Sequence, residues 1–190
     1  MESENQQLLI EGVEACGLRV VPGQVAALVA YHDALMETNA GGLNLTGLKD
    51  ERDSVIKNLL DSLAPWHHVG DPETCETQTL VEIGAGAGLP GIPLGIVLPF
   101  ERVILIETKE KKCAFLRDIA DALNDLLAPR KIEVLRGDAR TLPVPRRYDR
   151  LVVRAFGRLQ PILRFVDRLV ARDGRGLAYK GRRERIDDEH

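Results

Sequence analysis

The first third of the chain places its apolar residues at the spacing of α-helices. Residues 6–15 and 24–37 follow this period, and Pro22 is well placed to start the second segment. The apolar stripe of that segment consists of Val25, Leu28, Val29, His32 and Leu35. Residues 39–50 break the pattern with a Gly-Gly pair, so a loop is expected there.

A third helix is predicted before the pattern changes. Asp53 or Ser54 is expected to cap it, and Pro65 is expected to end it. The apolar face of this helix contains Val55, Ile56, Leu59, Leu60 and Leu63. Residues 70–78 are polar and rich in turn formers. Residues 1–69 are therefore expected to form a helical extension that a short connection joins to the rest of the chain.

From residue 79 onward, short apolar runs alternate with helical segments. The predicted strands are residues 80–83, 103–106, 132–135, 151–153 and 176–179. Helices are expected after Pro90 and at residues 109–127 and 159–170. This alternation is typical of a parallel sheet with right-handed crossovers. The prediction is one domain, residues 1–190, in which residues 79–181 form an α/β core: a mostly parallel, twisted sheet with helices on both faces.

Composition narrows the class of protein without identifying it. The chain has 190 residues, of which 44% are hydrophobic and 29% charged, as in ordinary globular domains. Its three cysteines are widely spaced, which argues against a disulfide framework or a zinc site. The acidic start MESENQQ is unlike a signal peptide, and the most apolar window, 81–100, contains Glu82, three prolines and five glycines. The expected location is the cytoplasm, without a membrane span.

Charge is distributed unevenly along the chain. Residues 1–79 contain four Lys or Arg against thirteen Asp or Glu, whereas residues 130–185 contain seventeen against six. A basic half of this kind can concentrate a polyanion such as RNA near a site. The alternative is that these arginines are solvated positions on helices and loops.

The most informative local pattern is a glycine-rich loop at residues 82–88. Gly84, Gly86 and Gly88 occupy every second position, which allows the backbone to approach a ligand closely. The amides of the following helix are expected to point toward polar ligand groups. A dinucleotide-binding fingerprint requires glycine at position 89, where this chain has Leu89, and no Gly-Lys-Ser/Thr triplet follows. Both of those nucleotide-binding motifs are therefore excluded.

Two carboxylates follow the next two strands. Glu107 ends the second predicted strand, where a carboxylate can accept hydrogen bonds from both hydroxyls of a ribose. Asp138 follows the third strand and is expected to meet an adenine edge. Because the carboxyl ends of parallel strands share one edge of the sheet, the pattern predicts a ligand that contains adenosine. The alternative is a glycine-rich turn that binds no ligand.

The residues around the glycine-rich loop resemble a motif of a known family. Residues 81–94, VEIGAGAGLPGIPL, are similar to the cofactor motif of the bacterial 16S rRNA guanine-N7 methyltransferases, also called glucose-inhibited division protein B. The continuation GLPGIPL is more specific than the glycines alone. Five more stretches agree in order and spacing: Asn44-Leu45-Thr46, Leu60-Asp61-Ser62, residues 111–116, residues 153–156 and Lys180-Gly181.

The resemblance covers roughly residues 25–181 and departs from the family at two places. Asn58 stands where the family usually has a histidine. The family also normally continues after the position of Lys180 into a final pair of antiparallel strands.

The resemblance implies a Rossmann-like class I methyltransferase that uses S-adenosylmethionine. The implied reaction is methylation of N7 of a guanine, position 527 of 16S rRNA, in the small ribosomal subunit. The cofactor-binding residues expected from loop and resemblance together are Glu82, Gly84, Gly86, Gly88, Leu89, Glu107, Asp138, Ala139, Arg140 and Arg154. Arg154 and Lys180 are the candidate catalytic residues, and no metal ligand is predicted.

The implied chemistry needs few catalytic groups. Guanine N7 carries an in-plane lone pair, so its methylation requires no prior deprotonation, and holding the reactants in line can supply roughly 7–11 kcal/mol. Cys113 lies mid-helix on the apolar side and is interpreted as a core residue, which disfavours a cytosine-C5 enzyme. The sequence Val153-Arg154-Ala155-Phe156 replaces the (N/D)PP(Y/F) motif of exocyclic-amine methylases.

The roles of several basic and aromatic residues stay open in the sequence. Arg154 is expected to form a fork to a cofactor carboxylate or an RNA phosphate, or else a surface ion pair with a nearby acid such as Glu107 or Asp138. Phe156 is expected either to stack on a base or to pack in the core. The cluster Arg182, Arg183 and Arg185 either holds RNA, together with Lys180, or is a solvated tail.

The sequence leaves two alternatives to an rRNA methyltransferase open. One is a methyltransferase that acts on a small molecule or a protein. The other is a catalytically inactive relative that binds RNA or a nucleoside. The oligomeric state expected by default is a monomer.

Overall fold

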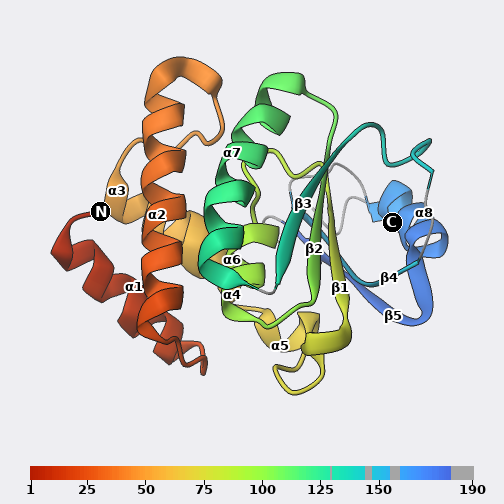
Figure 1. The fold of residues 1–190 in the computed structure, drawn as a ribbon, viewed down its shortest axis with the longest axis horizontal. Helices are drawn as coiled ribbons and strands as arrows, with labels where there is room; N and C mark the ends of the chain where they lie inside the picture. Colours follow the sequence, from red (N-terminus) through yellow and green to blue (C-terminus); the bar gives the residue numbers. More distant parts are fainter. Residues whose placement is uncertain (129, 144–146, 155–158, 181–190) are drawn as a thin grey trace.

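The computed structural model describes residues 1–128, 130–143, 147–154 and 159–180. The strands among these residues form one five-stranded parallel sheet. The strand order is β3-β2-β1-β4-β5 (Figure 1). The strands are β1 (Thr79–Ile83), β2 (Arg102–Glu107), β3 (Lys131–Arg136), β4 (Tyr148–Arg154) and β5 (Val170–Tyr179). The order reverses between β1 and β4, and in open α/β sheets this switch point is where ligands bind.

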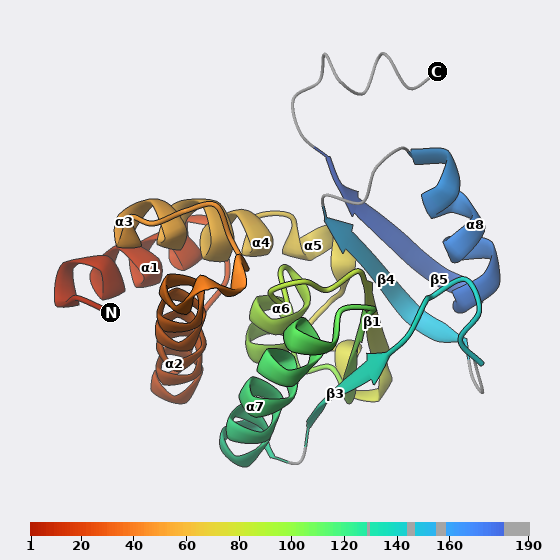
Figure 2. The same ribbon diagram turned by 90° about the horizontal axis from the view of Figure 1, so that it is seen from above.

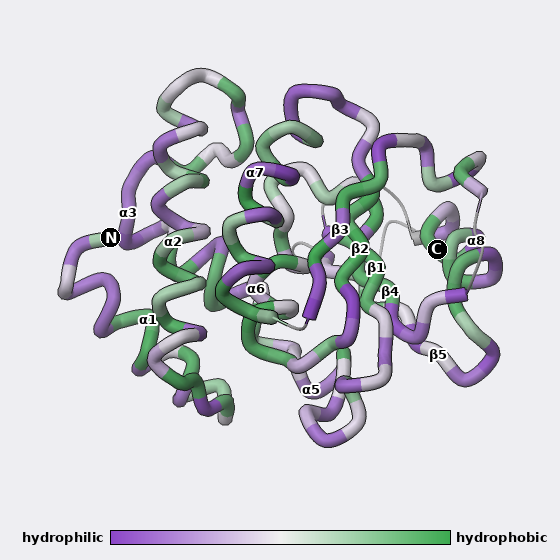
Figure 3. Tube along the Cα trace, viewed as in Figure 1, coloured by the Kyte–Doolittle hydropathy of each residue, from purple (hydrophilic) through white to green (hydrophobic). Residues whose placement is uncertain are grey.

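Helices cover both faces of this sheet, as predicted. The helices α6 (Gly91–Val97) and α7 (Glu110–Leu127) lie on one face, and α8 (Leu159–Leu169) lies on the other (Figure 2). Because side chains alternate along a strand, the sheet contributes to two separate hydrophobic clusters. Figure 3 shows apolar positions along the central strands β1 and β2, whereas β5 at the edge contains hydrophilic positions. The predicted Rossmann-like α/β class is therefore confirmed.

The N-terminal helices pack on the α6–α7 side. They comprise α1 (Ser3–Ala15), α2 (Pro22–Thr38), the π-helical turn η1 (Asn39–Leu43), α3 (Glu51–Ser54), the π-helical segment η2 (Val55–Leu60), α4 (Asp61–Leu63), α5 (Trp66–Val69) and the 3₁₀ turn η3 (Cys75–Thr77). They share one hydrophobic cluster with α6 and α7. None of the described helices is both long and apolar enough to cross a membrane.

The third predicted helix begins earlier than the pattern indicated. Its cap is Asp50, whose side chain accepts a hydrogen bond from Asp53 N at 2.8 Å, so the predicted cap at Asp53 or Ser54 is wrong. Ile56, predicted on the apolar face, is 39% exposed. The predicted loop after α2 starts with the η1 turn, in which Gly42 has φ +95°.

The last strand is longer than predicted. The pattern indicated a helix to residue 170 and a strand only from Gly176, but α8 ends at Leu169 and β5 begins at Val170. β5 is an edge strand of the described sheet, and its Arg172, Asp173 and Arg175 are exposed. An edge strand needs no run of apolar residues, which is why the pattern missed its first half.

Hydrogen bonds connect the helical extension to the α/β core. Gln24 Nε2 donates to the carbonyls of Ile96 and Val97, both at 3.0 Å, at the end of α6. Tyr179 Oη, at the end of β5, donates to Ser62 O at 2.7 Å. The bond from Tyr179 therefore ties the extension to the edge of the sheet at which the predicted site residues lie.

Candidate functional site

The glycine loop follows β1 in a left-handed backbone conformation. Gly84, Gly86 and Gly88 have φ values of +68°, +59° and +88°. The amides of Gly84 and Ala85 donate to Ile106 O of β2 at 2.9 and 3.0 Å, which fixes the start of the loop. Positive φ values favour glycine, so the alternation recognised in the sequence has a backbone cause.

A cleft of about 340 Å³ lies along this loop, and we call it the glycine-loop cleft. Its lining residues are Leu45, Thr46, Asn58, Gly84, Ala85, Gly86, Ala87, Leu89, Glu107, Lys112 and Arg154. The helical extension supplies one wall, and the ends of β2 and β4 supply another. Three of the predicted site residues from the loop, Gly84, Gly86 and Leu89, thus meet the strand-end side chains of Glu107 and Arg154 in one cleft.

Glu107 is buried at the end of β2 with its carboxylate directed at the loop. Oε2 accepts from Gly86 N at 2.9 Å, while Oε1 accepts from the amides of Thr108 at 2.6 Å and Lys109 at 2.8 Å. Burial alone would raise the pKa of Glu107, but the hydrogen bonds from Lys109, Gly86 and Thr108 outweigh it and hold the pKa below its usual value. Oε2 accepts a hydrogen bond from Gly86 N among the described residues, so it retains capacity for another donor.

A second cleft of about 240 Å³ adjoins the first at Gly84, and we call it the Asp138 cleft. Its walls are mainly apolar, with Ile83 and Ile106 from the sheet and Pro161 and Phe165 from α8. Its remaining lining residues are Gly84, Thr108, Gly137, Asp138, Ala139 and Arg140. The apolar walls and the polar rim of this cleft suit a planar heterocycle with polar edges.

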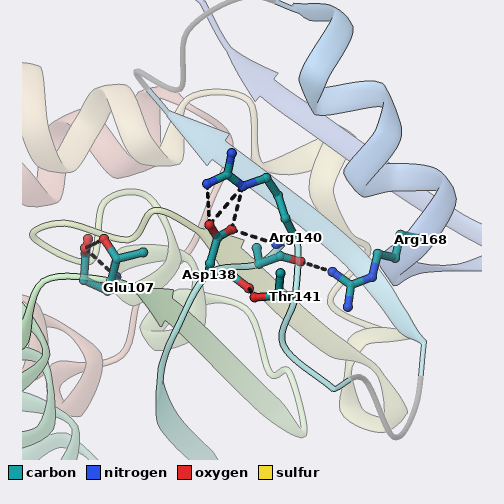
Figure 4. Close-up of polar contacts among 7 residues, drawn as sticks. Glu107, Asp138, Arg140, Thr141 and Arg168 are labelled. Carbon is teal, nitrogen blue, oxygen red and sulfur yellow. Dashed lines mark hydrogen bonds and ion pairs between the residues drawn. The ribbon is translucent and has the colours of Figure 1, made fainter.

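Asp138 lies at this cleft, but its carboxylate is already engaged by Arg140 (Figure 4). Arg140 Nε lies 2.9 Å from both carboxylate oxygens, a second guanidinium nitrogen contacts Oδ2, and Arg140 N donates to Oδ1 at 2.9 Å. The hydrogen bonds from the Arg140 side chain and backbone lower the pKa of Asp138 to about 2. The carboxylate is therefore ionised and held in one orientation at neutral pH.

Arg154 forms an ion pair with a nearby acid, as the alternative expected, but its partner is Asp61 rather than Glu107 or Asp138. Its guanidinium forms an ion pair with Asp61 at 2.8 Å and donates to Lys57 O at 2.6 Å and Ser62 Oγ at 3.2 Å. Arg154 pairs with residues of the extension rather than with the acids of the sheet edge, because the extension places η2 and α4 against the end of β4. Lys180 follows Tyr179, the register partner of Arg154, so both candidate catalytic residues lie at the same end of the sheet.

Glu82 lines neither cleft. It is 1% exposed beneath the loop, where its Oε2 accepts from Gly91 N at 2.9 Å, and its Oε1 has no partner among the described residues. Ile92 N donates to Gly88 O at 2.8 Å. The first amides of α6 are therefore used within the protein, which corrects the expectation that they face a ligand.

Glu82 should make the stability of the protein pH-dependent. Burial raises the pKa of Glu82 to about 8, and Glu107 adds to this, whereas Gly91 and Arg154 oppose it. Since the folded-state pKa lies above the usual value of 4.5, stability is lost as pH rises from about 5 toward 8. As pH rises over that interval, the melting temperature of a Glu82→Gln variant should therefore increase relative to that of the wild type. Calorimetric melting across the range tests this.

The control for the Glu82 prediction is Glu101→Gln, because Glu101 is an exposed acid of the same chain. This variant should follow the wild-type pH profile. Parallel profiles for the wild type and Glu82→Gln would contradict the buried, mostly protonated state of Glu82.

Sequence patterns missed several residues at the site. Tyr31 is fully buried in α2 and donates its hydroxyl to Ala87 O at 2.9 Å, so the extension holds the glycine loop from behind. Lys112 and Phe165 line the two clefts. Tyr31 lies three residues after Leu28 on the apolar stripe, and that spacing is the feature that could have identified it.

Other residues singled out in the sequence have plainer roles. Cys113 is fully buried, which confirms its interpretation as a core residue. The described residues contain no cluster of three or more potential metal ligands. Phe156 and the cluster Arg182, Arg183 and Arg185 lie outside the described residues.

Comparison with solved structures places the fold. The chain is similar to a SAM-dependent methyltransferase from Thiobacillus denitrificans in complex with S-adenosyl-L-homocysteine, with TM-score 0.51, 12% identity and coverage of 62% of this chain and 46% of that one. It is also similar to mycolic acid cyclopropane synthase CmaA1, with TM-score 0.53, 17% identity and coverage of 68% and 43%. At these identities the likeness concerns the fold alone.

Comparison with curated proteins and family models identifies the family. The chain is 35% identical over 175 residues to ribosomal RNA small subunit methyltransferase G of Marinobacter nauticus, covering 91% of this chain and 76% of the relative. The protein of the same name from Burkholderia pseudomallei is 36% identical over 179 residues, with coverage of 93% and 75%. The GidB family model, rRNA small subunit methyltransferase G, matches residues 24–190, and the chain belongs to this family.

Proposed function

We propose that this protein transfers a methyl group from S-adenosylmethionine to N7 of a guanine, position 527, in 16S rRNA of the small ribosomal subunit. The observation that carries the proposal is the position of Glu107, buried at the end of β2 with Oε2 directed at Gly86. This arrangement lies beside the β1–β4 switch point, in a chain that belongs to a family of rRNA methyltransferases.

The residues present fit the cofactor at three points. Glu107 Oε2, with its remaining acceptor capacity, would accept from the ribose. Asp138 and the backbone of Ala139 and Arg140 would meet the adenine in the Asp138 cleft. Gly84, Gly86 and Leu89 would lie along the nucleoside, with Arg154 at the far wall of the glycine-loop cleft. Glu82 and Gly88 would act indirectly, by supporting the loop from beneath.

The fit of the cleft rests on space at Gly86. A Cβ at this position would have only Gly84 O, at 3.7 Å, and Lys112 Nζ, at 3.9 Å, as neighbours within 4 Å. The surface above the loop is therefore open for a ligand. By contrast, a Cβ at Gly88 would collide with Ile92 at 2.3 Å, so that glycine is required by internal packing.

The chemistry of the proposed reaction places modest demands on the chain. S-adenosylmethionine supplies, when bound, a methyl group activated by a sulfonium. The N7 lone pair of guanine forms the new bond to that methyl group without losing a proton, so a general base is unnecessary. The chain's residues bind and orient the two reactants, a contribution of roughly 7–11 kcal/mol when the alignment is good. Arg154 and Lys180, at one end of β4 and β5, are proposed to hold the RNA strand for this alignment.

Basic residues on the C-terminal half support an RNA substrate. Arg140, Arg164, Arg172 and Arg175 are all exposed, on the turn after β3, on α8 and on β5. A basic surface attracts the phosphate backbone and makes binding depend on salt. We further propose that the protein acts as a monomer in the cytoplasm; light scattering of the purified protein tests the first point.

A methyl-transfer assay tests the proposed function directly. Tritiated S-adenosylmethionine would be offered with 30S subunits, with free 16S rRNA and with unrelated small molecules and proteins. The expected result is transfer to the ribosomal substrate, followed by borohydride and aniline cleavage at the modified guanine. Transfer only to a small molecule or a protein would support the first alternative. Cofactor binding without any transfer would support an inactive relative.

Loss of the Arg154 guanidinium should impair transfer more than cofactor binding. Arg154→Ala is expected to lower kcat/KM for the ribosomal substrate about tenfold, equivalent to about 1.4 kcal/mol, because a charge-assisted contact is removed. Asp61→Asn should give a smaller loss, since Asp61 orients the arginine. The control is Arg52→Ala, because Arg52 is exposed and pairs only weakly with Glu4 at 3.9 Å. Full activity of Arg154→Ala would remove this residue from the mechanism.

A further inference from the structure

The turn after β3 forms the polar rim of the Asp138 cleft. Gly137 N donates to Glu107 O at 2.9 Å, which joins the start of the turn to the end of β2. The amides of Thr141 and Leu142 donate to Asp138 O, both at 2.9 Å. These bonds close the turn upon itself but do not connect it to the layer of helices above the sheet.

Arg168 makes that connection. From the last turn of α8 its guanidinium donates to two carbonyls of the turn, those of Ala139 and Leu142. Figure 4 shows Arg168 on one side of the turn and the Asp138–Arg140 pair on the other. Because one planar group contacts two carbonyls three residues apart, it restrains both the position and the orientation of the turn.

The base of Arg168 is fixed. Ile162, Phe165 and Leu169 of α8 are buried in the cluster beneath it, so the helix cannot shift without disturbing the core. Phe165 also lines the Asp138 cleft. The same helix therefore supplies an apolar wall of the cleft and the restraint on its polar rim.

Arg140 cannot replace this restraint. Its side chain is 75% exposed, and it pairs with Asp138 only two residues away. Exposed pairs of this kind contribute little to stability and are screened by salt. Arg168 is half-buried and contacts the backbone from a separate element. The positive charge of Arg168 also helps to lower the pKa of Asp138, consistent with its closeness.

We propose that Arg168 is a positioning residue for the nucleoside end of the cofactor. By restraining residues 138–142 it directs the Asp138 carboxylate and the adjoining amides into the Asp138 cleft, where they distinguish adenine from a heterocycle with a different edge. This inference rests on the proposed function, because it assigns a residue to the recognition of the same cofactor. Arg168 itself touches no reacting atom.

Binding of two nucleosides tests the inference. Calorimetry would compare S-adenosylhomocysteine with S-inosylhomocysteine, in which a carbonyl replaces the adenine amine. For Arg168→Ala we expect about tenfold weaker binding of the adenine compound and a nearly unchanged affinity for the inosine compound. The ratio of the two affinities, which measures the preference for adenine, should therefore fall. Millimolar guanidinium chloride should restore part of that preference.

The controls separate positioning from folding. Arg164→Ala removes an exposed arginine one turn earlier in α8 and should leave both affinities unchanged. Arg168→Lys keeps the charge without the planar fork, and an intermediate preference is expected. It also serves as the test if Arg168→Ala does not fold.

Each outcome has one meaning. A wild-type protein that binds neither compound contradicts the proposed function itself. If the wild type prefers adenine and the Arg168 variants keep that preference, the inference is overturned. An equal loss of both affinities together with a lower melting temperature also overturns it, because Arg168 would then be only structural.

Discussion

Replacing Gly86 with valine should abolish measurable binding of S-adenosylhomocysteine, a loss of more than about 100-fold. Gly86 has φ +59°, and its missing side chain faces the glycine-loop cleft, with nothing closer to an added Cβ than 3.7 Å. The valine side chain would therefore project into the space that the ligand needs, and its branched Cβ would also strain the left-handed backbone. Isothermal calorimetry measures the affinity, and a melting curve reports whether the fold is retained.

Gly17 offers a matched control for the backbone strain. It too has a positive φ, +81°, but an added Cβ would meet nothing within 4 Å, and it lines neither cleft. Gly17→Val should cost roughly 1–2 kcal/mol of stability and leave the affinity unchanged. A Gly86→Val protein with wild-type affinity would reject the assignment of this loop to the cofactor. Equal losses of affinity in both variants would assign the effect to instability.

The sequence predicted the elements whose determinants are local. The glycine loop and Glu107 are examples. β2 is a buried parallel strand whose apolar run ends at Glu107, and β1 is a short, mostly apolar strand that the glycines follow directly. The alternation of strands and helices then places both features at one edge of the sheet. Parallel topology requires this arrangement, so a ligand cleft along the glycine loop could be expected from the sequence.

Side-chain partners across the fold could not be predicted in this way. Arg154 selects Asp61, 93 residues earlier, because the extension brings α4 against the end of β4. Arg168 and the carbonyl of Ala139 are separated by 29 residues. Neither contact has a periodicity, since each depends on how two elements pack. The same reasoning applies to Tyr31, whose hydroxyl reaches a loop 56 residues away.

Two carboxylates near the loop show how environment decides the role. Glu82 is enclosed beneath the loop with one hydrogen bond, and burial raises its pKa to about 8. Glu107 is also buried, but hydrogen bonds from three backbone amides lower its pKa, which keeps it ionised at neutral pH. A charged acceptor suits the hydroxyls of a ribose, whereas a mostly neutral acid supports the backbone around it. Their order in the chain does not distinguish them.

Removing the Glu107 carboxylate should weaken binding of S-adenosylhomocysteine by about 1.5–3 kcal/mol, because a charged acceptor is lost. Glu107→Ala removes the bond to Gly86 N and those to the Thr108 and Lys109 amides, so both the loop and the ribose site are affected. Glu107→Gln keeps an acceptor oxygen for part of this set and should lose less. Calorimetry of the two variants measures both changes.

A matched acid separates this specific role from a general effect of charge. Glu110, in the first turn of α7, is exposed and forms surface ion pairs with Arg117 and Arg136. Glu110→Ala removes the same charge three residues later in the chain and should bind S-adenosylhomocysteine as the wild type does. If Glu107→Ala also binds with wild-type affinity, the ribose cannot be held at the end of β2. The adenosine would then have to lie elsewhere on the sheet edge, and the proposed function would lose its main support.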